Sequence, residues 1–77
     1  MRLSIEKKFG EELCRIRKER GLSQEQLGFE SEYHRTYISQ LERGVKSPSL
    51  RTVFRICKAL EIPVSELIRR IEAGKCS

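Results

Sequence analysis

Tryptophan is absent from this chain of 77 residues, histidine occurs once and cysteine only three times. Cys14, Cys57 and Cys76 form no CxxC pair, and His34 is not at metal-ligand spacing from any of them. This spacing argues against a zinc site, and the odd number argues against a disulfide framework. We expect Cys14 and Cys57 to be small apolar side chains in helices, and the free thiols favour a reducing cytoplasm.

Long apolar runs and strand patterns are also missing. No stretch is apolar enough for a signal peptide or a membrane span. No run alternates apolar and polar residues with the period of two that indicates a strand, and there is no internal repeat or linker. We therefore expect a soluble, intracellular, all-α protein in which residues 1–77 form one domain with its core at about 5–73.

The chain lacks the residue groupings on which catalysis usually depends. There is no nucleophile with a general base in local support, no metal cluster and no glycine-rich loop to hold a phosphate. So short a chain also has little material with which to enclose a substrate. We therefore expect no enzymatic activity, no cofactor and no small-molecule ligand.

Charge, by contrast, is abundant. Sixteen Lys and Arg against eleven Asp and Glu give 16 − 11 = +5, and charged residues make up 35% of the chain. A basic balance favours an anionic partner such as nucleic acid, although many basic proteins bind none. Charge alone therefore does not decide the function.

The N-terminal part of the chain has the spacing of one amphipathic helix. Phe9, Leu13 and Ile16 form a single apolar stripe, which predicts a helix over about 5–20. Gly21 follows the last turn and fits the left-handed position that commonly ends a helix.

The segment from Ser23 to Gly44 predicts two short helices joined by a tight turn. Ser23 is expected to be an N-cap that forms a capping box with Gln26, and the first helix would cover about 24–30. Residues 31–34 break the pattern. Ile38 and Leu41 then predict the inner face of a second helix over about 35–43.

The outer face of that second helix is polar and basic. A short helix with an apolar back and such a front suits the DNA major groove, which admits one helix and presents donors and acceptors. The hypothesis is a helix-turn-helix that binds double-stranded DNA through a front consisting of Arg35, Thr36, Ser39, Gln40 and Arg43.

Two more helices follow. The fourth is expected to begin with Ser47 as N-cap and Pro48 at the first helical position, and the fifth to cover about 63–73 and end at Gly74. The whole fold is predicted as a compact five-helix domain with a central helix-turn-helix. Its expected core consists of Phe9, Leu13, Ile16, Leu22, Leu27, Ile38, Leu41, Leu50, Val53, Ile56, Leu60 and Leu67.

The C-terminal segment has more apolar residues than the end of a small monomer needs. Either they close the bottom of the core, or they form a face for self-association, because exposed apolar patches often mark such faces. We favour the second interpretation, a homodimer interface formed by Ile62, Val64, Leu67, Ile68 and Ile71.

Parsed in this way, about residues 9–70 resemble the Cro and lambda-repressor type of helix-turn-helix domain. The resemblance rests on the string LCRIRKERGLSQEQLGFESEYHRTYISQLERG, followed by PSL and a further helix. Within that family the chain is similar to the small controller proteins of restriction–modification systems. The resemblance implies a homodimeric autoregulator that reads a two-fold related operator. Short phage or chromosomal repressors share the same core.

The resemblance also implies residue roles. Gln24 would contact a phosphate and brace the second helix, and Arg17 and Glu42 would form a structural salt bridge. Tyr37 would either pack over the turn or touch the DNA backbone, and His34 is expected to cap a helix. The other implied DNA contacts are Arg35, Thr36, Ser39 and Gln40 at base edges, and Arg43 and Lys46 at the DNA backbone, with Ser47 or Ser49 as a further candidate there.

Two positions depart from the family pattern. Gly28 stands where the family usually has alanine, which lowers helix propensity by about 1 kcal/mol. Glu32 stands at the turn position that the family usually fills with glycine, and a glutamate at positive φ is uncommon. We therefore expect a strained or slightly reshaped turn. A different function also remains open, that of an antitoxin or co-regulator whose main role is protein–protein interaction.

Overall fold

The computed structural model describes residues 4–73, which form five α-helices. They are α1 (Ile5–Glu19), α2 (Gln24–Ser31), α3 (Arg35–Glu42), α4 (Leu50–Leu60) and α5 (Val64–Ala73). No strand occurs within the described residues, and the prediction of an all-α fold is confirmed. None of the described helices is long and apolar enough to cross a membrane. The expected helix end at Gly74, and Cys76, lie outside the described residues.

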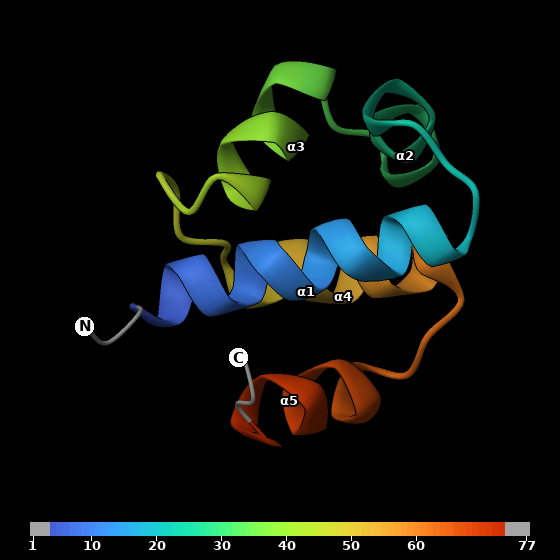
Figure 1. Ribbon diagram of the computed structural model, residues 1–77. Coiled ribbons are helices and arrows are strands. Elements are labelled where there is room, and N and C mark those ends of the chain that lie inside the picture. The colour runs from blue at the N-terminus through green and yellow to red at the C-terminus, as the bar shows by residue number, and fades with distance from the viewer. Residues whose placement is uncertain (1–3, 74–77) are drawn as a thin grey trace.

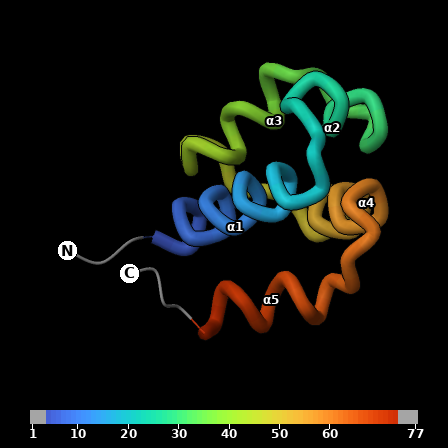
Figure 2. Tube along the Cα trace, turned by 45° about the vertical axis from the view of Figure 1, so that its right-hand side comes forward, coloured from blue at the N-terminus to red at the C-terminus, as the bar shows by residue number. Residues whose placement is uncertain are grey.

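The helices are arranged in three levels (Figure 1). α1 and α4 lie in the middle, the α2–α3 pair lies on one side of them and α5 on the other, and the turned view in Figure 2 shows the same order. One hydrophobic cluster joins the three levels, and Leu13, Ile16, Leu27, Ile38 and Leu41 within it are completely buried. The helix-turn-helix pair therefore rests on a core to which all five helices contribute.

Four of the helices end in the same way, through a residue with positive φ. These residues are Gly21, Glu32, Gly44 and Glu61, with φ of 73°, 66°, 75° and 57°. At each end two backbone N–H groups bond back to carbonyls of the last turn, the arrangement of a Schellman motif. The left-handed conformation expected of Gly21 is confirmed, and so is the positive φ expected of Glu32.

The start of α4 corrects one prediction. Ser49 is the N-cap, and its hydroxyl accepts a hydrogen bond from the backbone N–H of Thr52 at 3.1 Å. Ser47 and Pro48 therefore precede the helix, which begins two residues later than expected. With this start the side chain of Leu50 points away from the core and is 74% exposed, so its assignment to the core was wrong.

The C-terminal apolar residues also differ from their expected role. Ile62, Leu67 and Ile71 are 7%, 1% and 7% exposed and belong to the chain's own core. Val64 is half-buried against that core, and only Ile68 is substantially exposed, at 43%. Three of the five residues predicted for a dimer interface therefore close the bottom of the monomer, because α5 packs against α1 and α4.

Candidate nucleic-acid interface

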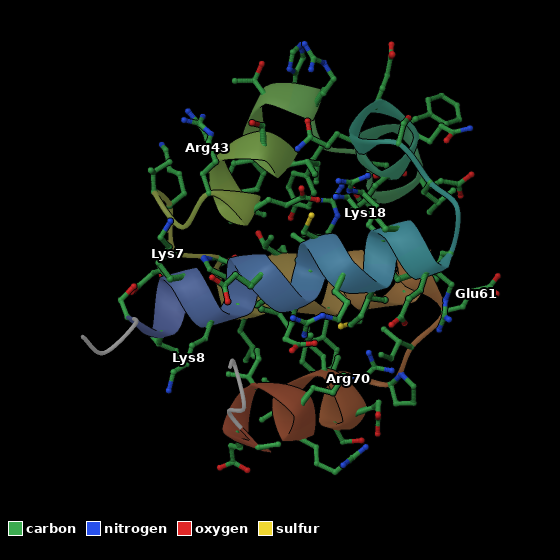
Figure 3. The ribbon with its side chains drawn as sticks, viewed as in Figure 1. Lys7, Lys8, Lys18, Arg43, Glu61 and Arg70 are labelled. Carbon is green, nitrogen blue, oxygen red and sulfur yellow. The ribbon has the colours of Figure 1, made fainter. Side chains whose placement is uncertain are left out.

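The polar front predicted for α3 lies on one side of that helix. Ile38 and Leu41 are fully buried, whereas Arg35, Thr36 and Arg43 are exposed. Ser39 and Gln40 are half-buried on the same front. The helix thus presents hydrogen-bonding side chains outward from a fixed apolar back. Figure 3 shows this outward side of α3, with Arg43 labelled, on the level farthest from α5.

His34 starts α3, as expected of a helix cap. Its Nδ1 accepts a hydrogen bond from the backbone N–H of Thr36 at 3.0 Å, and its φ and ψ are those of an N-cap. The ring therefore satisfies one of the donors that every helix start leaves open. His34 has a structural task at the edge of the polar front.

The end of α3 is fixed by a buried charged group. Arg17 donates from Nε to Glu42 Oε2 at 2.6 Å and from Nη2 to Oε1 at 3.1 Å, so the pair is bidentate. Gln24 Nε2 donates to the same carboxylate at 3.0 Å. The ion pair and the brace that the resemblance implies are both present in the structure. Together they tie α1, α2 and α3 to one another.

Hydrogen bonding decides the charge state of this group. Burial pushes the pKa of the Glu42 carboxyl upward, but hydrogen bonds from Arg17 and Gln24 outweigh burial and hold the pKa below its usual range. The hydrogen bond with Glu42 likewise raises the pKa of Arg17. The pair is therefore ionised at neutral pH.

Gly10 allows α3 to lie directly on α1. A Cβ atom at this position would be 2.4 Å from the backbone oxygen of Leu41 and 2.5 Å from that of Glu42. Only a glycine permits such an approach of two helices. Gly10 was not among the residues predicted for the site, although a glycine in the middle of a helical pattern is the available signal.

Tyr37 packs beside the turn. Its ring centroid is 5.0 Å from that of Tyr33, and its hydroxyl is 3.5 Å from the hydroxyl of Thr52 on α4. Thr52 is 4% exposed and also bonds with the hydroxyl of Tyr33, at 2.9 Å. Of the two alternatives for Tyr37, the geometry favours packing over the turn. Thr52 was not predicted from the sequence, because its partners come from distant positions.

The loop after α3 brings further basic groups to the same level. Lys46 is exposed in this loop, and Lys7 Nζ donates to the carbonyl of Arg43 at 3.2 Å. Figure 3 shows Lys7 and Arg43 at the same end of the molecule. Lys46, three residues after Arg43, therefore adds a positive charge in the loop that follows the front of α3.

Comparison with known proteins agrees with this geometry. The sequence profile of the helix-turn-helix family matches residues 15–67. Control protein C.BamHI of Bacillus amyloliquefaciens is 41% identical over 69 residues, which cover 88% of this chain and 85% of that protein.

Solved structures are similar as well. The restriction–modification controller protein C.AhdI of Aeromonas hydrophila superposes with a TM-score of 0.79 at 40% identity, over 80% of this chain and 94% of that one. The wild-type controller protein C.Esp1396I gives a TM-score of 0.86 at 28% identity, over 94% of this chain and 95% of that one.

Proposed function

We propose that the protein regulates transcription by binding a two-fold related operator, because the chain belongs to the helix-turn-helix family and within it to the controller proteins of restriction–modification systems. α3 would enter the major groove, and we call it the reading helix. The observation that carries the proposal is the polar front of α3 on a fully buried apolar back. The genes controlled would be those of a restriction–modification system, including its own.

Each residue of the front has a proposed role. Arg35, Thr36, Ser39 and Gln40 would meet base edges, which set the sequence that is read. Arg43 and Lys46 would meet phosphates, which fix the register and much of the affinity. Gln24 braces Glu42 at the end of α3 and Tyr37 packs over the turn, and we propose that both side chains also approach the DNA backbone.

The protein would act by binding rather than by catalysis, as one domain, in the cytoplasm where its DNA lies. The polar front supplies donors and acceptors at the surface, which is the chemistry of recognition. Buried carboxylates such as Glu42 are already committed to structural partners.

Arg35→Ala tests the placement of the reading helix. We expect it to weaken binding to the preferred duplex by roughly 1–3 kcal/mol, because a bidentate contact with one base is lost. The preferred duplex is first obtained by selection from a random pool at near-physiological salt, and affinities are then measured by fluorescence anisotropy.

Two further variants serve as controls for Arg35→Ala. Lys46→Ala should weaken all sequences alike and lower the salt slope by about 1, as a phosphate contact does. Arg69→Ala, which removes a positive charge on the far side of the molecule, should change neither quantity. Unchanged binding in Arg35→Ala would contradict the proposed pose of α3. If Arg35→Ala loses self-association and keeps its DNA binding, the antitoxin or co-regulator interpretation is favoured.

We also propose that the protein is a homodimer, with an interface that lies beside the front rather than below the core. An apolar groove opens at the side of the molecule between the start of α1, the loop before α4 and the end of α5, with Ile5 (62% exposed) and Ile68 on its rim. Its apolar lining consists of Ile5, Phe9, Pro48, Val53, Ile68 and Ile71, and Glu6, Ser47 and Glu72 complete its wall.

The position of the groove suits a two-fold pair. In Figure 1 its three elements meet at the left-hand edge of the molecule, whereas α3 lies above. A lateral axis there would place both reading helices on one side of the dimer. The molecule measures 33 × 23 × 23 Å, which is compatible with half-sites one DNA turn, roughly 34 Å, apart.

Ile68→Glu tests this interface. A charge on the rim of the groove should raise the dimer dissociation constant at least about tenfold, because an unpaired charge is costly to bury. Sedimentation equilibrium measures the constant. Phe29→Glu, at another exposed apolar position, should leave it unchanged. A dimer that persists in Ile68→Glu but dissociates in Phe29→Glu would move the interface to α2.

A further inference from the structure

The turn between α2 and α3 has an unusual residue at its tightest point. Glu32 has φ 66° and ψ 34°, the left-handed conformation that glycine adopts most readily. The backbone N–H of Tyr33 bonds to the carbonyl of Gly28 at 2.8 Å and closes the turn. Since α3 begins only three residues after Glu32, the conformation here sets the direction of the reading helix.

Arg55, on α4, contacts three consecutive residues of this turn. Its Nη2 lies 3.1 Å from the carbonyl oxygen of Ser31, 3.4 Å from that of Glu32 and 3.0 Å from Glu32 Oε1. Its guanidinium also lies over the ring of Tyr33, 4.5 Å from the ring centroid. One side chain thus holds the carbonyls, the carboxylate and the following aromatic ring.

Gly28, on α2, lies against the same turn. A Cβ atom at this position would be 2.6 Å from the carbonyl oxygen of Tyr33 and 3.3 Å from the backbone nitrogen of Arg35. The turn is therefore folded closely onto α2, closer than an alanine would allow. The two departures from the family pattern, Gly28 and Glu32, thus belong to one tight turn.

We propose that Arg55 is a positioning residue for DNA recognition, which holds the left-handed turn at Glu32 and thereby aims the first turn of α3, with Arg35 and Thr36, at the bases. This inference rests on the proposed function. Arg55 itself need not touch DNA, because its guanidinium is engaged with the turn. Its ring contact and its carboxylate partner both belong to residues 32–33.

A second arginine provides a matched control. Arg20 Nε donates to the carbonyl of Leu60 at 2.7 Å, and its Nη2 to that of Glu61 at 3.4 Å. Glu61 is the other left-handed glutamate, at the end of α4. Figure 3 places Glu61 at the edge of the molecule away from α3. Arg20 therefore makes the same kind of contact where it cannot aim the reading helix.

The experiment compares the affinity for the selected duplex with that for a scrambled duplex, and records the salt slope. In Arg55→Ala we expect the ratio of the two affinities to fall about tenfold, the loss of roughly one base contact. Affinity for the scrambled duplex and the salt slope should remain as in the wild type. Arg20→Ala should lower the melting temperature and leave the ratio unchanged.

A rescue variant separates positioning from direct contact. Glu32→Gly, introduced into Arg55→Ala, should restore most of the ratio, because glycine adopts the left-handed conformation without help. If instead the salt slope falls by about 1 and Glu32→Gly restores nothing, Arg55 is a phosphate contact and the proposal is overturned. An unchanged ratio in Arg55→Ala would also overturn it.

Hydrogen exchange in the free protein keeps the test independent of DNA. Arg55→Ala should speed exchange of the amide of Tyr33, which closes the turn, and Glu32→Gly should slow it again. A wild type without sequence selectivity would contradict the proposed function, while exchange would still decide whether Arg55 holds the turn. If Arg55→Ala does not fold, Arg55→Lys, which keeps the charge but not the planar fork, replaces it.

Discussion

Glu42→Ala is expected to lower the free energy of unfolding by about 3 kcal/mol, because it leaves the buried guanidinium of Arg17 without its partner. The side chains of Arg17 and Glu42 are only 10% and 6% exposed, so water cannot replace the lost carboxylate easily. In a domain of this size the loss corresponds to a fall of more than about 10 °C in melting temperature. Thermal and urea unfolding followed by circular dichroism measure the effect.

The ion pair also predicts a pH dependence. Because the folded pKa of Glu42 is lowered, its contribution to stability is complete above the carboxyl's usual pKa of about 4.3 and is lost as pH falls through the lower folded value. Glu42→Gln removes this titration. The difference in stability between wild type and Glu42→Gln should therefore be constant at neutral pH and shrink in acid. A difference that grows in acid would contradict this sign.

Two control variants accompany Glu42→Ala. Glu66→Ala removes a surface carboxylate paired with arginines on its own helix, and exposed pairs contribute little. Gln24→Ala removes one hydrogen bond to Glu42 and should cost about 1 kcal/mol. If Glu42→Ala lowers the free energy of unfolding no more than Glu66→Ala does, the hydrogen bonds that Glu42 makes with Arg17 and Gln24 do not stabilise the fold as described.

Gly10→Ala is expected to destabilise the protein by about 2 kcal/mol, although alanine is the better helix former by about 1 kcal/mol. The new methyl group would be 2.4 Å and 2.5 Å from two backbone oxygens of α3. These atoms can retreat only if the whole helix shifts, so the clash outweighs the gain in propensity. Chemical denaturation gives the change in free energy.

Glu11→Ala is the matched control for Gly10→Ala, since it lies on the exposed side of the same helix. It should change stability by no more than about 0.5 kcal/mol. The shifted α3 in Gly10→Ala should also weaken binding to the selected duplex more than to a scrambled one. A Gly10→Ala protein more stable than the wild type would show that α1 and α3 lie farther apart.

The periodic features of the sequence predicted the helices well. The stripe of Phe9, Leu13 and Ile16 required only local spacing, and the capping box of Ser23 and Gln26 is present as expected. The start of α4 could not be decided locally. Ser47 before Pro48 is a good start signal. With Ser49 as the N-cap instead, Thr52 is buried and its backbone N–H donates a hydrogen bond to the Ser49 hydroxyl.

Features that depend on contacts between distant segments escaped the sequence analysis. Gly10 matters because two backbone oxygens of α3 lie against it, and Arg55 because its partners lie more than twenty residues earlier in the chain. Ile62 and Leu67, which the sequence pattern placed on a dimer face, lie in the chain's own core for the same reason. Apolar spacing identifies which residues are buried, but not whether the same chain or a second copy covers them.

The separation between the front of α3 and its support has an evolutionary consequence. Among the described residues, the side chains of Arg35 and Gln40 make no hydrogen bond within the protein, whereas Arg17, Glu42 and Arg55 bind several groups each. Under the proposed function, substitutions at Arg35 and Gln40 would therefore change the preferred operator with little loss of stability. The DNA sequence that is recognised could then change one base at a time during evolution, while the supporting residues stay the same.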